Sequence, residues 1–177
     1  MNEQTISPTI TVIHNRKSVR NYTGESVTQD QIEILLKAAM AAPSAVNCQP
    51  WEFVVVTDRK TLDKLGDVLP YSKMIYKAGA AIIVCGITAK AHKQMVEYAV
   101  IDSTLASENI LLAAEALGLG AIWTAAYPYP DRMESVRSIL NIPSEIIPLN
   151  VIPVGHPTGI DKPKKKFNPK KIHSETW

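Results

Sequence analysis

Residues 95–117 form the longest helical stretch that the sequence predicts, and the helix ends at Gly118. A helix that is apolar on nearly all sides must be covered on nearly all sides. In a chain of 177 residues a partner subunit is the simplest cover, and a central helix inside a monomer core is the alternative. The apolar residues that run most of the way round this helix are Val96, Ala99, Val100, Leu105, Ala106, Ile110, Leu111, Leu112, Ala113 and Ala114.

Composition predicts one domain spanning residues 1–177, which is long enough to bury a substantial core. Hydrophobic residues make up 46% and charged residues 20%, as in ordinary globular proteins. The net charge of +2 is too small to indicate a nucleic-acid partner, but lysines crowd the end of the chain. We expect residues 158–177 to form an extended basic tail, for which a solvated, frayed terminus is the simple alternative.

Cysteine usage and the N-terminus indicate a cytoplasmic protein. Cys48 and Cys85 are far apart and form no CxxC pair, so neither a disulfide framework nor a metal site is predicted. Cys85 belongs to a buried strand, and nothing near Cys48 suggests a nucleophile. Residues 1–5 lack a signal-peptide profile, and no apolar run approaches the roughly 20 residues that span a bilayer.

Periodicity and capping residues predict helices over 9–15, from Thr28 to Pro43, over 59–69 and over 131–140. Thr28 and Gln31 form a capping box, and Asp58 caps the third of these helices. Continuous apolar runs over 53–57 and 80–87 predict buried strands, and 121–125 predicts a short one. The last strand, 146–154, carries Pro148 and Pro153, which favours a place at the sheet edge.

Three short stretches carry the candidate chemistry. Residues 16–22 read RKSVRNY, residues 43–51 read PSAVNCQPW, and residues 162–166 read KPKKK. Two cationic ends therefore flank a turn rich in backbone donors. A bound phosphate ester that carries a polar, planar ring needs cations for its phosphate and amides for its ring edge. No Walker-type loop or strand–GxGxxG–helix unit competes for this assignment.

In this order and at this spacing, the three stretches resemble the nitroreductase-like flavoproteins, which bind FMN. The resemblance runs from about residue 10 to residue 177. It implies an α+β fold with a mixed central β-sheet flanked by helices. It also implies a homodimer with two active sites at the subunit interface, in which the C-terminal tail of each subunit extends across its partner.

The resemblance assigns the first stretch to the phosphate and to one edge of the flavin. Arg16 and Ser18 match the positions that hold the phosphate and ribityl chain, and Arg20 lies near N1 and the C2 carbonyl. A cation there stabilises the reduced, anionic flavin. Lys17 occupies a variable position among these cofactor-binding residues. On an extended strand Arg16, Ser18 and Arg20 share one face, although a solvated connector would also account for them.

The remaining cofactor-binding candidates come from the turn, a later strand and the tail. The turn packs on the flavin of the other subunit, unless it is only a helix stop. Residues 123–125 line the other face of the flavin, although a small buried strand explains them equally well. The tail lysines form a Lys-x-Lys pair over the phosphate, where the family more often has Lys-x-Arg. Gly155 begins a turn that matches the family's Gly-aromatic-Pro turn, in which His156 replaces the usual tyrosine; this histidine is either structural or near the substrate, and it is not assigned as a catalytic base. These candidates are Pro43, Ser44, Ala45, Asn47, Trp123, Thr124, Ala125, Gly155, Lys164 and Lys166.

The resemblance implies an FMN-dependent NAD(P)H oxidoreductase that works by a ping-pong mechanism. NADH or NADPH delivers a hydride to flavin N5 and leaves, and a small nitroaromatic or quinone-like acceptor then takes its place. Such transfer needs positioning and charge stabilisation, so no catalytic side chain is assigned. The alternatives are a flavin-sequestering, flavin-consuming or dehalogenase-like relative, and a nucleic-acid-binding module that uses the basic tail.

Overall fold

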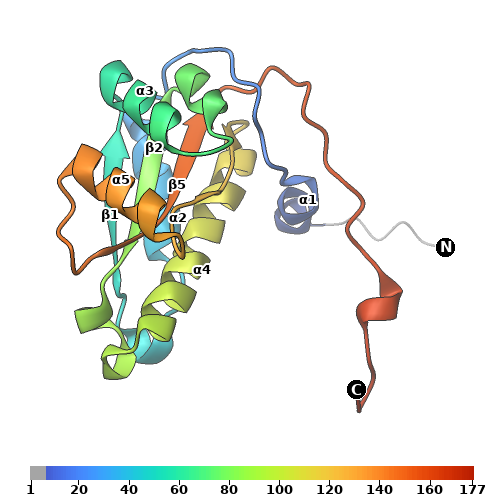
Figure 1. Cartoon of the computed structure of the whole chain (residues 1–177). Helices are drawn as coiled ribbons and strands as arrows, with labels where there is room; N and C mark the ends of the chain where they lie inside the picture. Colours follow the sequence, from blue (N-terminus) through green and yellow to red (C-terminus); the bar gives the residue numbers. More distant parts are fainter. Residues whose placement is uncertain (1–6) are drawn as a thin grey trace.

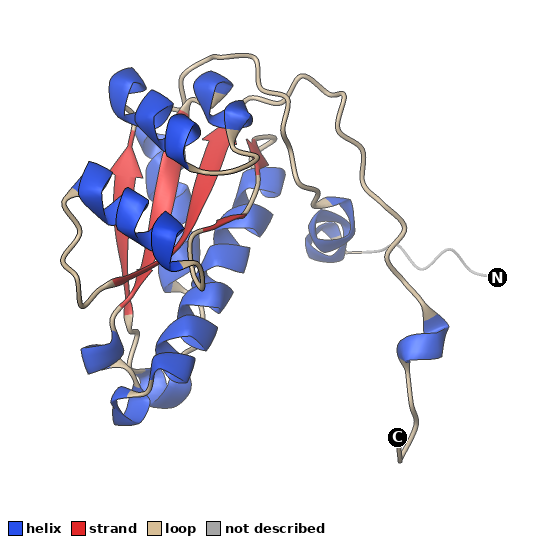
Figure 2. Cartoon of the chain, viewed as in Figure 1, coloured by secondary structure: helices blue, strands red, loops and turns tan. Residues whose placement is uncertain are grey.

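A computed structural model describes residues 7–177 and shows an antiparallel sheet with helices on both faces (Figures 1 and 2). The strands lie in the order β1-β2-β5-β3, and β4 also pairs with β5. A parallel bridge joins Ser18 to Ala121 at the β3 side. The α+β class is therefore confirmed. In chain order the elements are α1 (Pro8–Asn15), α2 (Gln29–Met40), β1 (Trp51–Val56), α3 (Arg59–Val68), β2 (Ala80–Gly86), α4 (Val96–Ala116), β3 (Gly120–Ala121), β4 (Thr124–Ala125), α5 (Pro130–Leu140) and β5 (Ile147–Gly155).

Two of the helices begin at the residues that the sequence predicts. The Thr28 side chain accepts from the backbone of Gln31, and the Gln31 side chain accepts from Thr28 N–H, which completes the capping box of α2. The Asp58 carboxylate accepts from Thr61 N–H at 2.8 Å and caps α3. Both caps satisfy backbone donors that a helix start leaves without partners.

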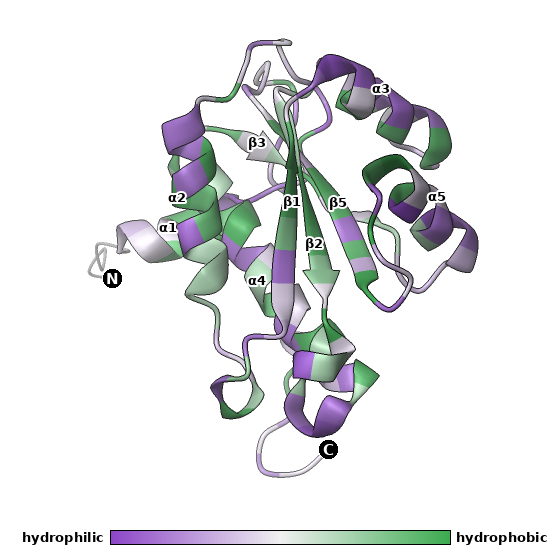
Figure 3. Ribbon diagram, turned by 90° about the vertical axis from the view of Figure 1, so that its left-hand side faces the viewer, coloured by the Kyte–Doolittle hydropathy of each residue, from purple (hydrophilic) through white to green (hydrophobic). Residues whose placement is uncertain are grey.

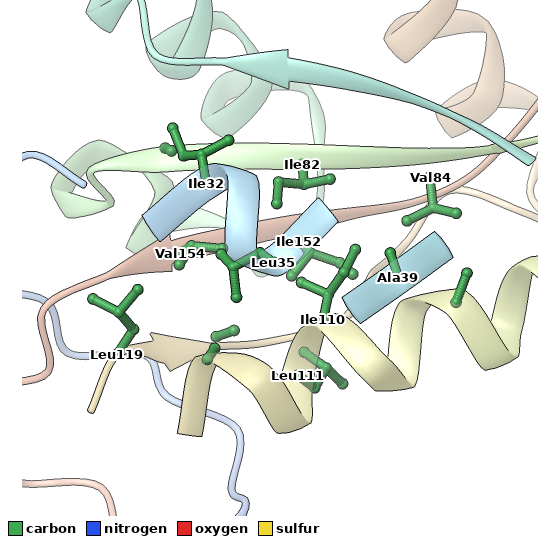
Figure 4. Close-up of a cluster of buried hydrophobic side chains, with 14 of the residues drawn as sticks. Ile32, Leu35, Ala39, Ile82, Val84, Ile110, Leu111, Leu119, Ile152 and Val154 are labelled. Atoms are coloured by element: carbon green, nitrogen blue, oxygen red, sulfur yellow. The ribbon is translucent and has the colours of Figure 1, made fainter. Parts of the chain in front are cut away.

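The sheet separates two hydrophobic clusters. Alternate residues of β2 and β5 face α2 and α4, where Leu35, Ile82 and Ile110 are fully buried (Figure 4). The other residues of β2 and β5 face α3 and α5, where Leu65, Ile83 and Val136 are fully buried. Figure 3 shows α3 and α5 on one side of the strands and α2 and α4 on the other. This layering buries β2 on both faces and makes it the rigid centre of the molecule.

The prediction that the last strand lies at an edge is wrong, because β5 lies between β2 and the short strands β3 and β4. The carbonyl of Val154 points toward β2 and accepts from Gly79 N–H. Because the backbone groups of successive strand residues point in opposite directions, the nitrogen of Pro153 points away from β2. On that side β3 and β4 are interrupted at Ile122 and Trp123, and no ladder bond is needed there. Pro148 lies beside a bulge in the β2–β5 pairing. The sheet therefore accepts both prolines where its ladder is already broken.

Two other strand predictions also need correction. β1 is an edge strand with exposed Glu52 and Val55, and it is not buried along its length as its apolar run suggests. In place of one strand over 121–125, the structure has two separate two-residue strands, β3 and β4, with Ile122 and Trp123 between them. In both cases the neighbouring elements, rather than the local sequence, decide which residues pair.

The long helix α4 is only partly covered within one chain. Ala106, Ile110 and Ala114 are buried against the sheet, whereas Ile101 and Leu105 are exposed by 55% and 40%. A partner subunit thus remains a prediction for the uncovered side. No helix in residues 7–177 is long and apolar enough to cross a membrane.

Candidate functional site

The first stretch and the C-terminal tail line one pocket of about 310 Å³. The sequence separates these segments by more than 140 residues, and the fold brings them side by side. Six of the predicted cofactor-binding residues are here together, joined by two more lysines of the tail. We call this site the basic pocket, and its lining residues are Arg16, Lys17, Ser18, Arg20, Lys162, Lys164, Lys165 and Lys166.

Backbone contacts to the sheet hold the first stretch extended. Val19 is buried, and its N–H donates to the carbonyl of Ala121 at 3.1 Å. The buried Tyr22 hydroxyl lies 2.9 Å from the carbonyl oxygen of Val19 and 3.1 Å from that of Pro153, so its one proton is shared between the two acceptors. Gly120 permits this approach, because a Cβ there would lie 2.5 Å from Val19 Cγ1. With Val19 pointing inward, Ser18 and Arg20 on either side are exposed, as the alternation of a strand predicts.

Two cations of the pocket are paired with carboxylates of α4. Arg16 Nε lies 3.2 Å from Glu108 Oε1, and Lys17 Nζ lies 3.0 Å from Glu115 Oε2. The Lys17 pair is mostly buried on both sides, so it ties the stretch to α4. Arg16 engages Glu108 through one edge of its guanidinium, which has five N–H donors in all. Arg16 therefore keeps donors for an anion, whereas Lys17 acts chiefly as an anchor.

Asp161 fastens the tail to the first stretch. Its carboxylate accepts from the backbone N–H of Arg20 at 3.0 Å and of Asn21 at 3.1 Å, and from Asn21 Nδ2. Partial burial would raise the pKa of Asp161, but these hydrogen bonds and the charge of Arg20 outweigh it and hold the pKa below its ordinary value. Lys166 Nζ adds a bond of 2.7 Å to the carbonyl of Arg16. The pocket is thus closed by contacts between the two segments.

A second pocket of about 170 Å³ adjoins the first at Arg20, which lines both. We call it the Trp123 pocket. It contains the predicted residues 123–125 from β4 and the turn before it. Sequence reasoning did not assign Arg132 to this site, because no local motif marks it. The residues that line it are Arg20, Pro70, Tyr71, Ser72, Met74, Ile122, Trp123, Thr124, Ala125 and Arg132.

The remaining candidates lie outside both pockets. The turn with Pro43, Ser44, Ala45 and Asn47 is anchored to the opposite end of α4, where Ala45 N–H donates to the buried carboxylate of Asp102 at 3.2 Å. Asp102 and Glu115 are about 20 Å apart along α4, at about 1.5 Å per residue. Within one chain the turn is therefore remote from the basic pocket.

Gly155 is packed rather than open to a ligand. A Cβ at Gly155 would lie 3.0 Å from Tyr22 Cδ1 and 3.2 Å from Gly79 N. The glycine thus lets the end of β5 pass close to Tyr22, the residue that fastens the first stretch. Gly155 therefore affects the site by allowing Tyr22 to pack against β5.

The described residues offer no metal cluster, and Cys85 is not an activated thiol. No group of three or more His, Cys, Asp or Glu side chains in residues 7–177 is placed to hold a metal ion. Burial raises the pKa of the Cys85 thiol to about 12, and the charge of Glu52 adds to the shift. A thiol with this pKa stays protonated at neutral pH and is a poor nucleophile.

Comparison with known proteins gives concordant results. The family model described as "Nitroreductase family" matches residues 13–70 and 67–156. A Methanothermobacter thermautotrophicus protein named "Putative NADH dehydrogenase/NAD(P)H nitroreductase" is 43% identical over 165 residues, which cover 93% of this chain and 85% of that protein.

Solved structures extend the likeness to the fold. A Parabacteroides distasonis structure that carries the same name has a TM-score of 0.91 and 48% identity, and the match covers 97% of this chain and 99% of the other. The FMN-dependent nitroreductase of Clostridium difficile R20291 has a TM-score of 0.87 and 25% identity, with 95% and 99% of the two chains covered.

Proposed function

Because the chain belongs to the nitroreductase family, we propose that it is an FMN-dependent oxidoreductase that takes electrons from NADH or NADPH. The observation that carries the proposal is the meeting of the basic pocket and the Trp123 pocket at Arg20. A cationic site that shares Arg20 with a site containing Trp123 and Tyr71 suits a phosphate joined to a planar ring.

The residues present fit an FMN phosphate. The basic pocket gathers two arginines, five lysines and a serine hydroxyl around about 310 Å³. Arg16, Ser18, Lys164 and Lys166 would hold the phosphate, since Lys17 is committed to Glu115. Lysine offers a point charge where arginine would offer a fork, and a dianionic phosphate accepts either.

The Trp123 pocket would receive one end of the flavin ring. Arg20, between the two pockets, would place a positive charge beside that ring, and residues 123–125 would lie along it. Bound there, the flavin would supply the redox chemistry, taking a hydride from the nicotinamide and passing it to the acceptor. The chain itself binds, orients and stabilises charge, which requires no acid, base or nucleophile.

We propose a ping-pong order in which the nicotinamide and the acceptor occupy the same place in turn. The acceptor would be a small oxidised molecule, nitroaromatic or quinone-like. In support, the described part of the chain has no strand–GxGxxG–helix unit that would hold a dinucleotide separately.

A homodimer would complete the site with the partner's turn over residues 43–47. The separation of about 20 Å along α4 leaves this turn unable to join its own chain's basic pocket. The uncovered side of α4 and an open apolar groove of about 590 Å³ between α1, α2 and α4 offer area for such a dimer. The extended tail that leaves the body in Figure 1 would reach across the partner.

A visible absorption spectrum of the purified protein tests the proposal. We expect a yellow protein, or one that becomes yellow with added FMN, and loss of the colour on anaerobic addition of NADH or NADPH. A yellow protein that neither nucleotide bleaches would be a flavin binder rather than a reductase. A protein that takes up no FMN would remove the proposed function altogether.

A further inference from the structure

Arg132 is the feature of the Trp123 pocket that the proposed function leaves unused. It lies in the first turns of α5 and lines the pocket together with Arg20. None of the residues that line this pocket is an aspartate or glutamate. Two arginines thus line a space of about 170 Å³, and no carboxylate among the lining residues balances their charge.

The surroundings of Arg132 hold its charge in place. Its guanidinium carbon lies 3.7 Å from the centre of the Tyr129 ring, in cation–π contact. Nη1 also donates to the carbonyl of Ala125, a lining residue, at 3.4 Å. Within residues 7–177 Arg132 makes no ion pair with an acid.

Arg137, five residues further along α5, shows what a structural arginine looks like in this fold. It donates through Nε and Nη2 to the carbonyl of Ile146, at 3.2 and 3.0 Å, and pairs with Glu134. These contacts use its donors to fasten α5 to β5. Arg132 has one long hydrogen bond and faces a pocket, so most of its donors remain available to a ligand.

We propose that Arg132 is a second cation of the flavin-ring site and favours the reduced over the oxidised cofactor together with Arg20. The inference rests on the proposed function, which puts the ring in the Trp123 pocket. Negative charge develops on the ring only upon reduction, so a fixed cation nearby stabilises the reduced form selectively. The same negative charge relieves the repulsion between Arg20 and Arg132.

The test is a redox titration of FMN-saturated wild type, Arg132→Gln, Arg132→Lys and the control Lys60→Gln. Lys60 is an exposed lysine of α3 outside both pockets, so its substitution removes the same unit of charge from the surface. We expect Arg132→Gln to weaken binding of reduced relative to oxidised FMN about tenfold, which lowers a two-electron midpoint by about 30 mV. Arg132→Lys should keep most of the wild-type value, and Lys60→Gln all of it.

The outcomes separate this inference from the proposed function. An unchanged or raised midpoint in Arg132→Gln, with FMN bound, overturns the role of Arg132 and leaves the flavin assignment standing. A wild type that binds no FMN overturns both. Arg132→Met is a second uncharged variant in case the glutamine variant does not fold, and it must lower the midpoint in the same way. A fall of the same size in Lys60→Gln would show that only net charge matters and would also overturn the inference.

Discussion

At the scale of single residues, Arg20 is fixed by its backbone and not by its side chain. Its N–H donates to Asp161, while its exposed side chain lines both pockets. Val19 and Tyr22, which precede and follow it, are buried and hold the backbone of Arg20 against the sheet. The backbone thus fixes the Cα position from which the exposed Arg20 side chain reaches a ligand.

We expect Arg20→Ala to lower the reduction potential of bound FMN and to slow reduction by the nicotinamide more than it weakens binding of oxidised FMN. The reason is that the charge it stabilises appears only on reduction. Arg20→Lys should preserve most of the potential, since a point charge suffices. A redox titration of the FMN-saturated variants measures this, and an unchanged or raised midpoint in Arg20→Ala would return Arg20 to the role of a surface residue.

Arg16→Ala is expected to weaken FMN binding about tenfold or more. It removes a charge-assisted bond worth roughly 1.5–3 kcal/mol and leaves Glu108 unpaired beside the phosphate. The Lys170→Ala variant is the matched control, because Lys170 is equally basic but does not line the pocket. Flavin fluorescence titration compares them. Equal losses in the two variants would mean that only general positive charge matters.

Tyr22→Phe tests how firmly the first stretch is fastened to the sheet. The substitution leaves the carbonyls of Val19 and Pro153 without their hydroxyl donor, at an expected cost of about 1–3 kcal/mol in the free energy of unfolding. Burial raises the pKa of Tyr22 well above its ordinary range, so the hydroxyl stays protonated and the loss should not depend on pH between 6 and about 9. Urea unfolding of both proteins gives the difference, and equal stabilities would contradict this account.

At the scale of elements, the tail is docked by Asp161, and the docking should depend on pH. The pKa of Asp161 is lower in the docked state than its ordinary value of 3.8. Because the pKa is lowered, the stabilisation of docking is fully present above the ordinary value of 3.8. It is lost as the pH falls through the lower pKa of the docked state. We therefore expect the Arg20 and Asn21 amide signals to hold their positions from neutral pH to about pH 4 and to shift below it.

An NMR titration of those two amides makes the measurement, with Asp161→Ala as the comparison. The variant has no carboxylate for them to contact, so its signals should already lie near the acid-state positions at neutral pH. A titration with the same midpoint in the variant would assign the shift to other groups. Trypsin cleavage at the tail lysines should also be faster in Asp161→Ala at neutral pH.

Local sequence is sufficient for the elements whose stabilising contacts are local. The caps at Thr28 and Asp58 depend on residues three positions further along the chain. The apolar face of α2 depends on residues three or four positions apart. These helices form where the sequence predicts. β5 depends on the ladder beside it. Pro153 reads as an edge residue until the gap between β3 and β4 is known, and that gap is a property of the assembled sheet.

The same contrast between local sequence signals and contacts across the fold applies to the site. The basic residues of the first stretch and the tail are recognisable by type and spacing, and the structure brings them together. Asp161 and Arg132 were missed, because a single acid in a lysine-rich tail and a single arginine on a helix carry no motif. Their roles arise from contacts across 140 residues for Asp161 and from the cation–π contact with Tyr129 for Arg132.

At the scale of the whole molecule, the two parts of the predicted site lie at opposite ends of α4. Glu115 near its end holds Lys17 of the basic pocket, and Asp102 nearer its start holds the turn at Ala45. Because the helix is rigid, the separation of about 20 Å cannot be closed within one chain. An antiparallel pairing of two copies along α4 would bring the turn of one subunit to the pocket of the other, and it would cover Ile101 and Leu105.

Mixing two variants that each impair FMN binding tests this arrangement. An Arg16→Ala subunit lacks the phosphate end of its own site, and an Asn47→Ala subunit lacks the turn that it supplies to its partner. In a heterodimer one site receives both defects, while the other combines an intact basic pocket with an intact turn. Half of the sites in each heterodimer should therefore recover FMN binding and activity.

The measurement is flavin binding and NAD(P)H oxidation after the two variants are mixed and allowed to exchange, with exchange followed by differently tagged subunits. Homodimers of each variant, treated identically, are the controls. If exchange occurs and neither binding nor activity recovers, the turn serves the pocket of its own chain or none, and the shared site is wrong. Recovery requires that the basic pocket and the turn of one subunit act in different sites, which a partner in contact along α4 would provide.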